Sequence, residues 1–222
     1  MYNHRMLRPI TLCRRTARKI LIAGLLIFAS TLITLTARQL NLGPDRPVPA
    51  FRSFGPKTAS IQIYEYTDFA CPACKAAYFQ LEDMLKLYDG RILVNFKHYP
   101  LMSIHKWSLD AAAYSDCAGE QGKFKEYAAL LFESQASWGR AEKKPPEFTV
   151  YAGKLKLDLP ALETCVNKDE TVKRIKLEMA EGDLKNVDAT PTFFINGKRA
   201  VGAGQLLDAA KHFDNLLKTG GK

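Results

Sequence analysis

The chain has 222 residues, with 32 Lys and Arg against 23 Asp and Glu, and a formal net charge of +9. Hydrophobic residues make up 47% of it and charged residues 25%, values typical of packed globular proteins. This composition excludes a mainly disordered chain and a membrane protein with many spans. The excess of positive charge raises the question of a nucleic-acid partner, and the answer depends on where the basic residues lie.

The basic residues are concentrated at the N-terminus. Residues 1–19 contain six Lys or Arg and no acid, and residues 20–37 (ILIAGLLIFASTLITLTA) contain no charged residue. Without the first 19 residues, 26 basic and 23 acidic residues remain, so the rest of the chain carries only +3. The charge therefore marks one segment rather than a nucleic-acid surface, and we expect no nucleic-acid partner.

A basic stretch followed by an apolar run predicts an N-terminal transmembrane anchor or signal segment. Eighteen uncharged residues match the length of a membrane span (about 17–25) better than the core of a signal peptide (about 7–15). Leu35 also fits the small-residue rule poorly for cleavage after Ala37. We expect residues 1–19 in the cytoplasm and residues 20–37 as an anchor in the inner membrane, with cleavage as the open alternative.

The next segment, residues 38–57, contains four Pro and two Gly, a composition typical of a semi-extended tether. Residues 58–222 then remain for one folded domain, which is long enough for a single hydrophobic core.

Within this domain the hydrophobic pattern predicts strand–helix–strand, a long helical region, and then strand–strand–helix. The first strand (60–67) alternates apolar and polar residues, and the helix that follows (72–87) ends at Asp-Gly. The remaining expected elements are a strand at 91–97, helices within 104–183, strands at 192–195 and 199–201 joined by Asn-Gly, and a helix at 206–217. This order predicts an α/β fold class.

The motif Cys71-Pro-Ala-Cys74 follows the first predicted strand and opens the first predicted helix. A helix N-terminus offers unpaired N–H groups and partial positive charge, which stabilise a thiolate. We therefore predict Cys71 as an exposed nucleophile of low pKa and Cys74 as the resolving thiol that attacks the mixed disulfide. A structural disulfide or half of a zinc site remains an alternative for a single CxxC.

A second motif, ATPTFFING, places Pro191 directly before a predicted strand, more than a hundred residues later. Together with YEYTDFACPAC and the helical region between them, it resembles the DsbA-like thiol-disulfide oxidoreductases of the bacterial cell envelope, in the thioredoxin superfamily. The resemblance covers roughly residues 58–218. It implies a thioredoxin-like fold with a helical insertion at about residues 104–183.

The resemblance also implies roles for single residues. Pro191 would be the cis-proline that faces the redox pair and docks an extended substrate, with Thr190 before it. Glu65 would assist proton transfer from the resolving cysteine, although strand alternation leaves an outward-pointing side chain open. Related proteins often carry a second disulfide across the insertion, which implies the pairing of Cys117 with Cys165. No cofactor or metal is expected.

The implied function is oxidation of exported cysteine-containing proteins by a membrane-tethered periplasmic domain, with reoxidation by a quinone-linked membrane partner. Ala73 stands where the strongest oxidants of this family have a histidine, so we expect a mild oxidase. An envelope reductase, for example in cytochrome maturation, is one alternative. A non-enzymatic thioredoxin-like module that binds a partner or holds a metal is another.

Overall fold

The structure is a computed structural model that describes residues 14–39 and 46–218. It divides the chain into two units, and the boundary in the sequence falls between Arg46 and Pro47. The first part of the predicted basic segment, residues 1–13, lies outside the described residues. So do residues 40–45 of the predicted tether.

The first unit contains α1 (Arg14–Gln39), one continuous helix. Its segment Thr16–Leu35 has a mean hydropathy of 1.8. Within the described residues, α1 is the one helix whose length and composition would allow it to cross a membrane. The large apolar side chains of this segment are exposed in the structure.

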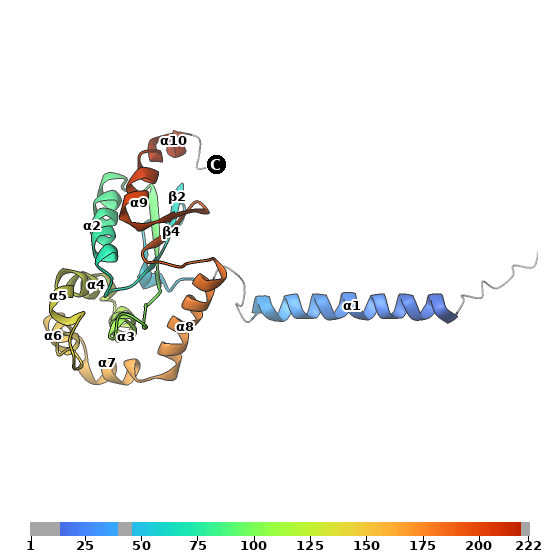
Figure 1. Ribbon diagram of the computed structural model, residues 1–222, viewed down its shortest axis with the longest axis horizontal. Coiled ribbons are helices and arrows are strands. Elements are labelled where there is room, and N and C mark those ends of the chain that lie inside the picture. The colour runs from blue at the N-terminus through green and yellow to red at the C-terminus, as the bar shows by residue number, and fades with distance from the viewer. Residues whose placement is uncertain (1–13, 40–45, 219–222) are drawn as a thin grey trace, which may run out of the picture. The chain divides into compact units, whose positions relative to one another are not determined.

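The second unit is built on one mixed sheet with the strand order β1-β3-β2-β4-β5 (Figure 1). β2 and β3 pair in parallel across α2, and the other neighbouring strands pair antiparallel. The strands are β1 (Ser53–Phe54), β2 (Ile61–Thr67), β3 (Ile92–His98), β4 (Thr192–Ile195) and β5 (Lys198–Val201).

Helices cover both faces of the sheet. On one face, Ile61 and Ile63 of β2 share a hydrophobic cluster with buried residues of α2 (Pro72–Leu87), α9 (Gly202–Ala210) and α10 (Phe213–Lys218). On the other face, the buried Glu181 of α8 accepts hydrogen bonds from Lys97 Nζ at 2.7 Å and from the Tyr66 hydroxyl at 2.9 Å. The two faces therefore differ in chemistry, one being apolar and the other held by buried ionic groups.

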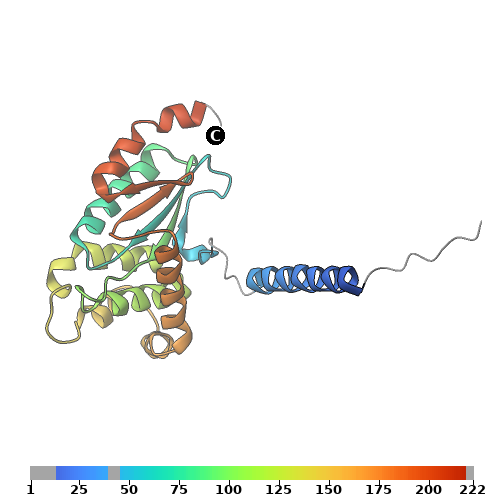
Figure 2. The ribbon, with the colours of Figure 1, turned by 45° about the vertical axis from the view of Figure 1, so that its right-hand side comes forward.

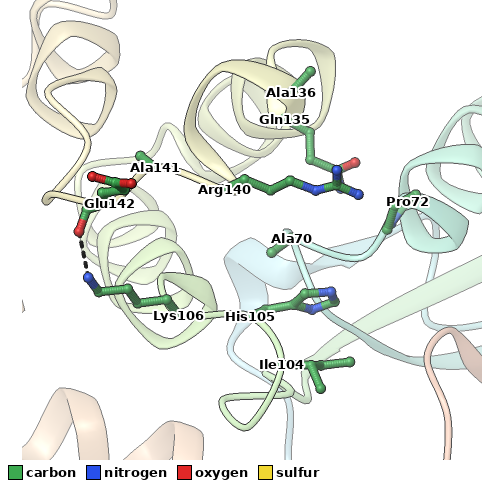
Figure 3. A pocket seen from close by; sticks show the side chains of 11 residues that line it. Ala70, Pro72, Ile104, His105, Lys106, Gln135, Ala136, Arg140, Ala141 and Glu142 are labelled. Carbon is green, nitrogen blue, oxygen red and sulfur yellow. Dashed lines mark hydrogen bonds between the residues drawn. The ribbon is translucent and has the colours of Figure 1, made fainter.

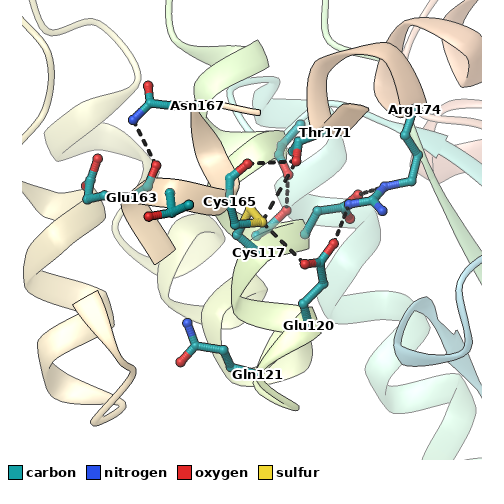
Figure 4. The surroundings of a disulfide bond; sticks show 12 residues. Cys117, Glu120, Gln121, Glu163, Cys165, Asn167, Thr171 and Arg174 are labelled. Carbon is teal, nitrogen blue, oxygen red and sulfur yellow. Dashed lines mark hydrogen bonds and ion pairs between the residues drawn. A yellow bond between two sulfur atoms is a disulfide. The ribbon is translucent and has the colours of Figure 1, made fainter. Parts of the chain in front are cut away.

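The helical insertion lies between β3 and β4 and gathers at one end of the sheet (Figures 1 and 2). Its core is rich in aromatic residues, and the disulfide Cys117–Cys165 joins α3 to α7 (Figure 4). This is the pairing that the resemblance implied. The helices are α3 (Ser108–Glu120), α4 (Phe124–Glu133), α5 (Gln135–Trp138), α6 (Glu147–Lys154), α7 (Leu159–Val166) and α8 (Asp169–Leu184).

The end of the predicted tether belongs to the folded unit, so the boundary predicted at residue 57 is wrong. Residues 50–52 form a 3₁₀ turn, and β1 pairs with β3. Arg52 is fully buried, and its guanidinium binds both carboxylate oxygens of Glu178 at 2.7 and 2.8 Å. Its Nε also lies 3.1 Å from Asp116. These ion pairs fix a Pro-rich stretch that reads as a linker in the sequence.

The single helix predicted at residues 206–217 is also wrong. The structure has two helices there, α9 and α10, which are separated at Lys211 and His212. The break allows the fully buried Phe213 to pack against Tyr88, with 5.6 Å between ring centroids.

We expect Arg52→Met to destabilise the folded unit by about 3–5 kcal/mol, because it leaves the buried Glu178 without its cation and removes one of the cations beside Asp116. Urea unfolding measures this loss. Arg199→Met is the matched control, since the ion pair of Arg199 with Asp188 is exposed and such pairs contribute about 0–1 kcal/mol. Equal losses in the two variants would show that the buried network does not hold the fold.

Candidate active site

The redox pair lies where β2 turns into α2. Cys71 occupies the residue before the helix, with φ −82° and ψ 121°, and Pro72 takes the first helical position. The N–H groups of Cys74 and Lys75 donate to the Cys71 carbonyl at 3.1 and 3.2 Å. Cys71 is 9% exposed and Cys74 fully buried, so the predicted nucleophile is the more accessible thiol but is far from open to solvent.

Asp68 fixes the turn that leads into the pair. Its buried carboxylate accepts the N–H groups of Ala70 at 2.8 Å and of Leu101 at 2.9 Å. It also lies 2.7 Å from Nδ1 of His105, which comes from the segment after β3. These contacts hold two chain segments together beside Cys71.

The helical insertion reaches the same turn through Gln135, the first residue of α5. Its side-chain amide donates to the carbonyl oxygens of Phe69 at 2.7 Å and of Cys71 at 2.9 Å. The ring of Phe69 packs against Phe132 of α4, with 4.9 Å between centroids. The turn is therefore held from the sheet side and from the insertion side.

The segment before β4 closes the site. The Thr190–Pro191 peptide is cis, and the Cys71 thiol donates to the Thr190 carbonyl at 3.3 Å. The Thr190 hydroxyl is buried and forms no hydrogen bond among the described residues. The structure thus brings the two motifs of the sequence, residues 71–74 and 190–191, into contact.

The two thiols have opposite pKa shifts. The pKa of Cys71 is lowered to about 5, and the largest cause is the hydrogen bond from the Cys74 side chain. Burial opposes this shift, whereas the Thr190 side chain and the N–H groups of Cys74 and Ala73 contribute to it. Burial, and next the neighbouring Cys71, raise the pKa of Cys74 well above its usual value. The arrangement supports one reactive thiolate beside one protonated thiol.

Glu65 points inward, so the outward orientation left open by the sequence does not occur. It is 1% exposed and lies with Ile63 and Thr67 on the face of β2 that α2 covers. Its partners in the sheet register are Phe96 and Phe193. Burial among these groups raises the pKa of Glu65 to about 8, and the Thr67 side chain opposes the rise.

The Thr67 side chain also lowers the pKa of Cys74. Sequence reasoning missed Thr67, Asp68 and Gln135. Thr67 has a readable signal, since it lies two residues after Glu65 and strand alternation puts both on one face. The bonds of Gln135 span 64 and 66 residues of sequence and have no local signal.

Curated relatives match about two thirds of the chain. An Na⁺/H⁺ antiporter NhaA 3 of Salinispora tropica is 34% identical over 145 residues, covering 65% of this chain and 21% of the relative. An NhaA antiporter of Herminiimonas arsenicoxydans is 27% identical over 149 residues, covering 67% and 23%. The chain spans about a fifth to a quarter of the length of these relatives.

Solved structures share the fold. Wolbachia pipientis alpha-DsbA1 is 22% identical, with a TM-score of 0.68, over 78% of this chain and 94% of that one. Oxidised Bacillus subtilis BdbD is 20% identical, with a TM-score of 0.66, over 75% and 92%. A family model described as thioredoxin matches residues 49–217, which is most of the chain. The chain therefore belongs to the thioredoxin family, and its fold is that of the DsbA proteins.

Proposed function

We propose that this protein is a thiol-disulfide oxidoreductase that passes the Cys71–Cys74 disulfide to exported cysteine-containing proteins. The observation that carries the proposal is the opposite shift of two thiol pKa values at one helix N-terminus, lowered for Cys71 and raised for Cys74. A thiolate of low pKa at Cys71 is both a good nucleophile and a good leaving group at neutral pH.

The exchange proceeds in two steps. A substrate thiolate attacks the Cys71 sulfur, a mixed disulfide forms, and Cys74 leaves as a thiolate. The second substrate thiolate then attacks the substrate sulfur of the mixed disulfide, and Cys71 leaves. The substrate gives up two electrons and two protons, and the enzyme ends with two reduced cysteines.

Glu65 is proposed to supply the proton that Cys74 needs when it leaves. A thiolate is costly at this buried position, and a carboxyl group with a pKa of about 8 carries a proton at pH 7. The Thr67 side chain lowers the pKa of both groups. The transfer moves the negative charge from the Cys74 sulfur to the Glu65 carboxylate, which a proton from solvent then neutralises.

The acidity of Cys71 favours the direction of mild oxidation. A pKa of about 5 lies between the values of about 3.5 for DsbA and 7 for thioredoxin. Stabilising the thiolate stabilises the reduced enzyme, so its disulfide is a better oxidant than that of thioredoxin. An envelope reductase and a non-enzymatic module remain the competing functions that the experiments below separate.

We further propose that α1 tethers the domain to the inner membrane, with the basic N-terminal segment in the cytoplasm and the redox site in the periplasm. The support is the apolar segment Thr16–Leu35 and the six basic residues that precede Ile20. A quinone-linked membrane protein would then reoxidise the Cys71–Cys74 pair.

The Cys74→Ala variant should accumulate mixed disulfides with exported proteins through Cys71, because no resolving thiol remains to release them. Non-reducing gels and mass spectrometry of the trapped complexes measure this. Cys71→Ser is the matched control and should trap nothing. A Cys71→Ser variant that keeps full function in cells would instead support the non-enzymatic module.

The same cells show the direction of electron flow and the location of the protein. In the wild type, the Cys71–Cys74 pair should be oxidised at steady state, and a mainly reduced pair would assign the reductase function.

After an alkaline carbonate wash, the intact chain should stay in the membrane pellet. A soluble product that begins near residue 38 would assign a cleaved signal segment.

In the reduced wild type, we expect the Cys71 thiolate to appear with a midpoint near pH 5, because its pKa is lowered. Since the folded pKa lies below the unfolded one, the thiolate stabilises the reduced fold, and this stabilisation is lost as the pH falls through about 5. The pH dependence of iodoacetamide alkylation measures the midpoint. A midpoint near 8.5, the value of a free cysteine, would contradict the assignment.

Glu65→Gln should slow oxidation of a dithiol peptide at pH 7 by about tenfold or more, since it removes the proton donor. The alkylation midpoint of Cys71 should stay unchanged. Because the pKa of Glu65 is raised in the folded state, the free energy of unfolding of the wild type should also fall relative to that of the variant as the pH rises from about 4.5 to 8. Unchanged kinetics with this stability profile would assign Glu65 a structural role only.

A further inference from the structure

A pocket of about 670 Å³ opens directly beside the redox turn (Figure 3). Ala70 and Pro72, the two neighbours of Cys71 in the chain, line one side of it. A group bound in this pocket would therefore lie within a residue or two of the reacting sulfur. The opposite wall is the segment after α5, residues 139–142.

That wall is built to hold one side chain in place. Trp107 Nε1 donates to the Ala141 carbonyl at 2.7 Å, and Lys106 Nζ donates to the Glu142 carbonyl at 2.5 Å. A Cβ on Gly139 would lie 2.8 Å from the Gln135 carbonyl, so this tight turn requires glycine. Arg140 sits between these fixed points, and its side chain points into the pocket toward Pro72 (Figure 3).

The pocket carries an excess of positive charge. Lys106 and Arg140 line it, and Glu142 is the one acid among the lining residues; His105, which also lines it, is paired with Asp68. Lys106 donates to a carbonyl oxygen and forms no ion pair with any residue that the structure describes. Arg140 is exposed and forms no hydrogen bond or ion pair within the described residues. A guanidinium held open beside another cation is suited to bind a carboxylate that arrives from outside.

We propose that Arg140 selects substrates by binding a carboxylate side chain near their reacting cysteine. This inference rests on the proposed disulfide exchange and adds a specificity to it. An extended peptide advances about 3.3 Å per residue, so an Asp or Glu two residues from the cysteine places its carboxylate about 7 Å along the chain. The substrate class is therefore a cysteine-containing segment with acidic neighbours.

The test uses oxidised full-length protein and reduced two-cysteine peptides that differ only in the residues two positions from each cysteine, set to Glu, Gln or Lys. Stopped-flow kinetics gives the second-order rate constant of peptide oxidation for the wild type and for Arg140→Gln. The ratio of the two cancels the intrinsic reactivity of each peptide. We expect the wild type to be about three- to tenfold faster for the Glu peptide, equal for Gln and slower for Lys.

Three further arms sharpen the result. Lys143→Gln removes an exposed charge that does not line the pocket, and it should behave as the wild type. Arg140→Glu should reverse the preference in favour of the Lys peptide, and 1 M salt should abolish it. Equal ratios for all three peptides would overturn the proposal while leaving disulfide exchange intact. A wild type that oxidises none of the peptides would overturn the proposed function and this specificity with it.

Discussion

The carboxylate of Asp68 is the constraint on which the redox site depends. Cys71 has no side-chain cap for the helix it precedes, so the turn before it needs another support. Asp68 provides this support from a fully buried position, by binding the turn itself and the segment after β3. The same contact orients His105 and so shapes the pocket beside the turn. Reactive thiol and neighbouring pocket thus share one support.

Buried acids in this fold behave in opposite ways because of their neighbours. Glu65 lies on the apolar face under α2, where burial raises its pKa to about 8. Burial would also raise the pKa of Asp116, but His98 and Arg52 lower it to about 2. One carboxyl group is therefore available to carry a proton, whereas the other is a permanent charge that holds the chain together. The two carboxyl groups differ in their neighbours: Asp116 lies beside His98, Arg52 and Arg174, whereas the register partners of Glu65 are Phe96 and Phe193.

Much of the site could be predicted because its signals are local. The CxxC motif is adjacent in sequence to the strand and helix that position it, and the helix at residues 72–87 has the predicted bounds. Arg52 could not be predicted, because its partner Glu178 lies 126 residues away and its own surroundings read as a linker. The role of Gln135 could not be predicted for the same reason, since its partners are also distant in sequence. The break before Phe213 likewise depends on packing against Tyr88, the residue after α2, and the hydrophobic periodicity of residues 206–217 carries no information about that contact.

The two hydrogen bonds of Gln135 have a mechanical consequence. Both acceptors are carbonyl groups of the redox turn, whereas the donor belongs to the insertion. Any hinge motion that carries α5 away from the sheet must break both bonds at once, which removes one donor from each of the two carbonyl groups. Opening of the insertion and loosening of the turn at Cys71 are therefore a single cooperative event. One side-chain amide thereby couples the helical insertion to the turn at Cys71.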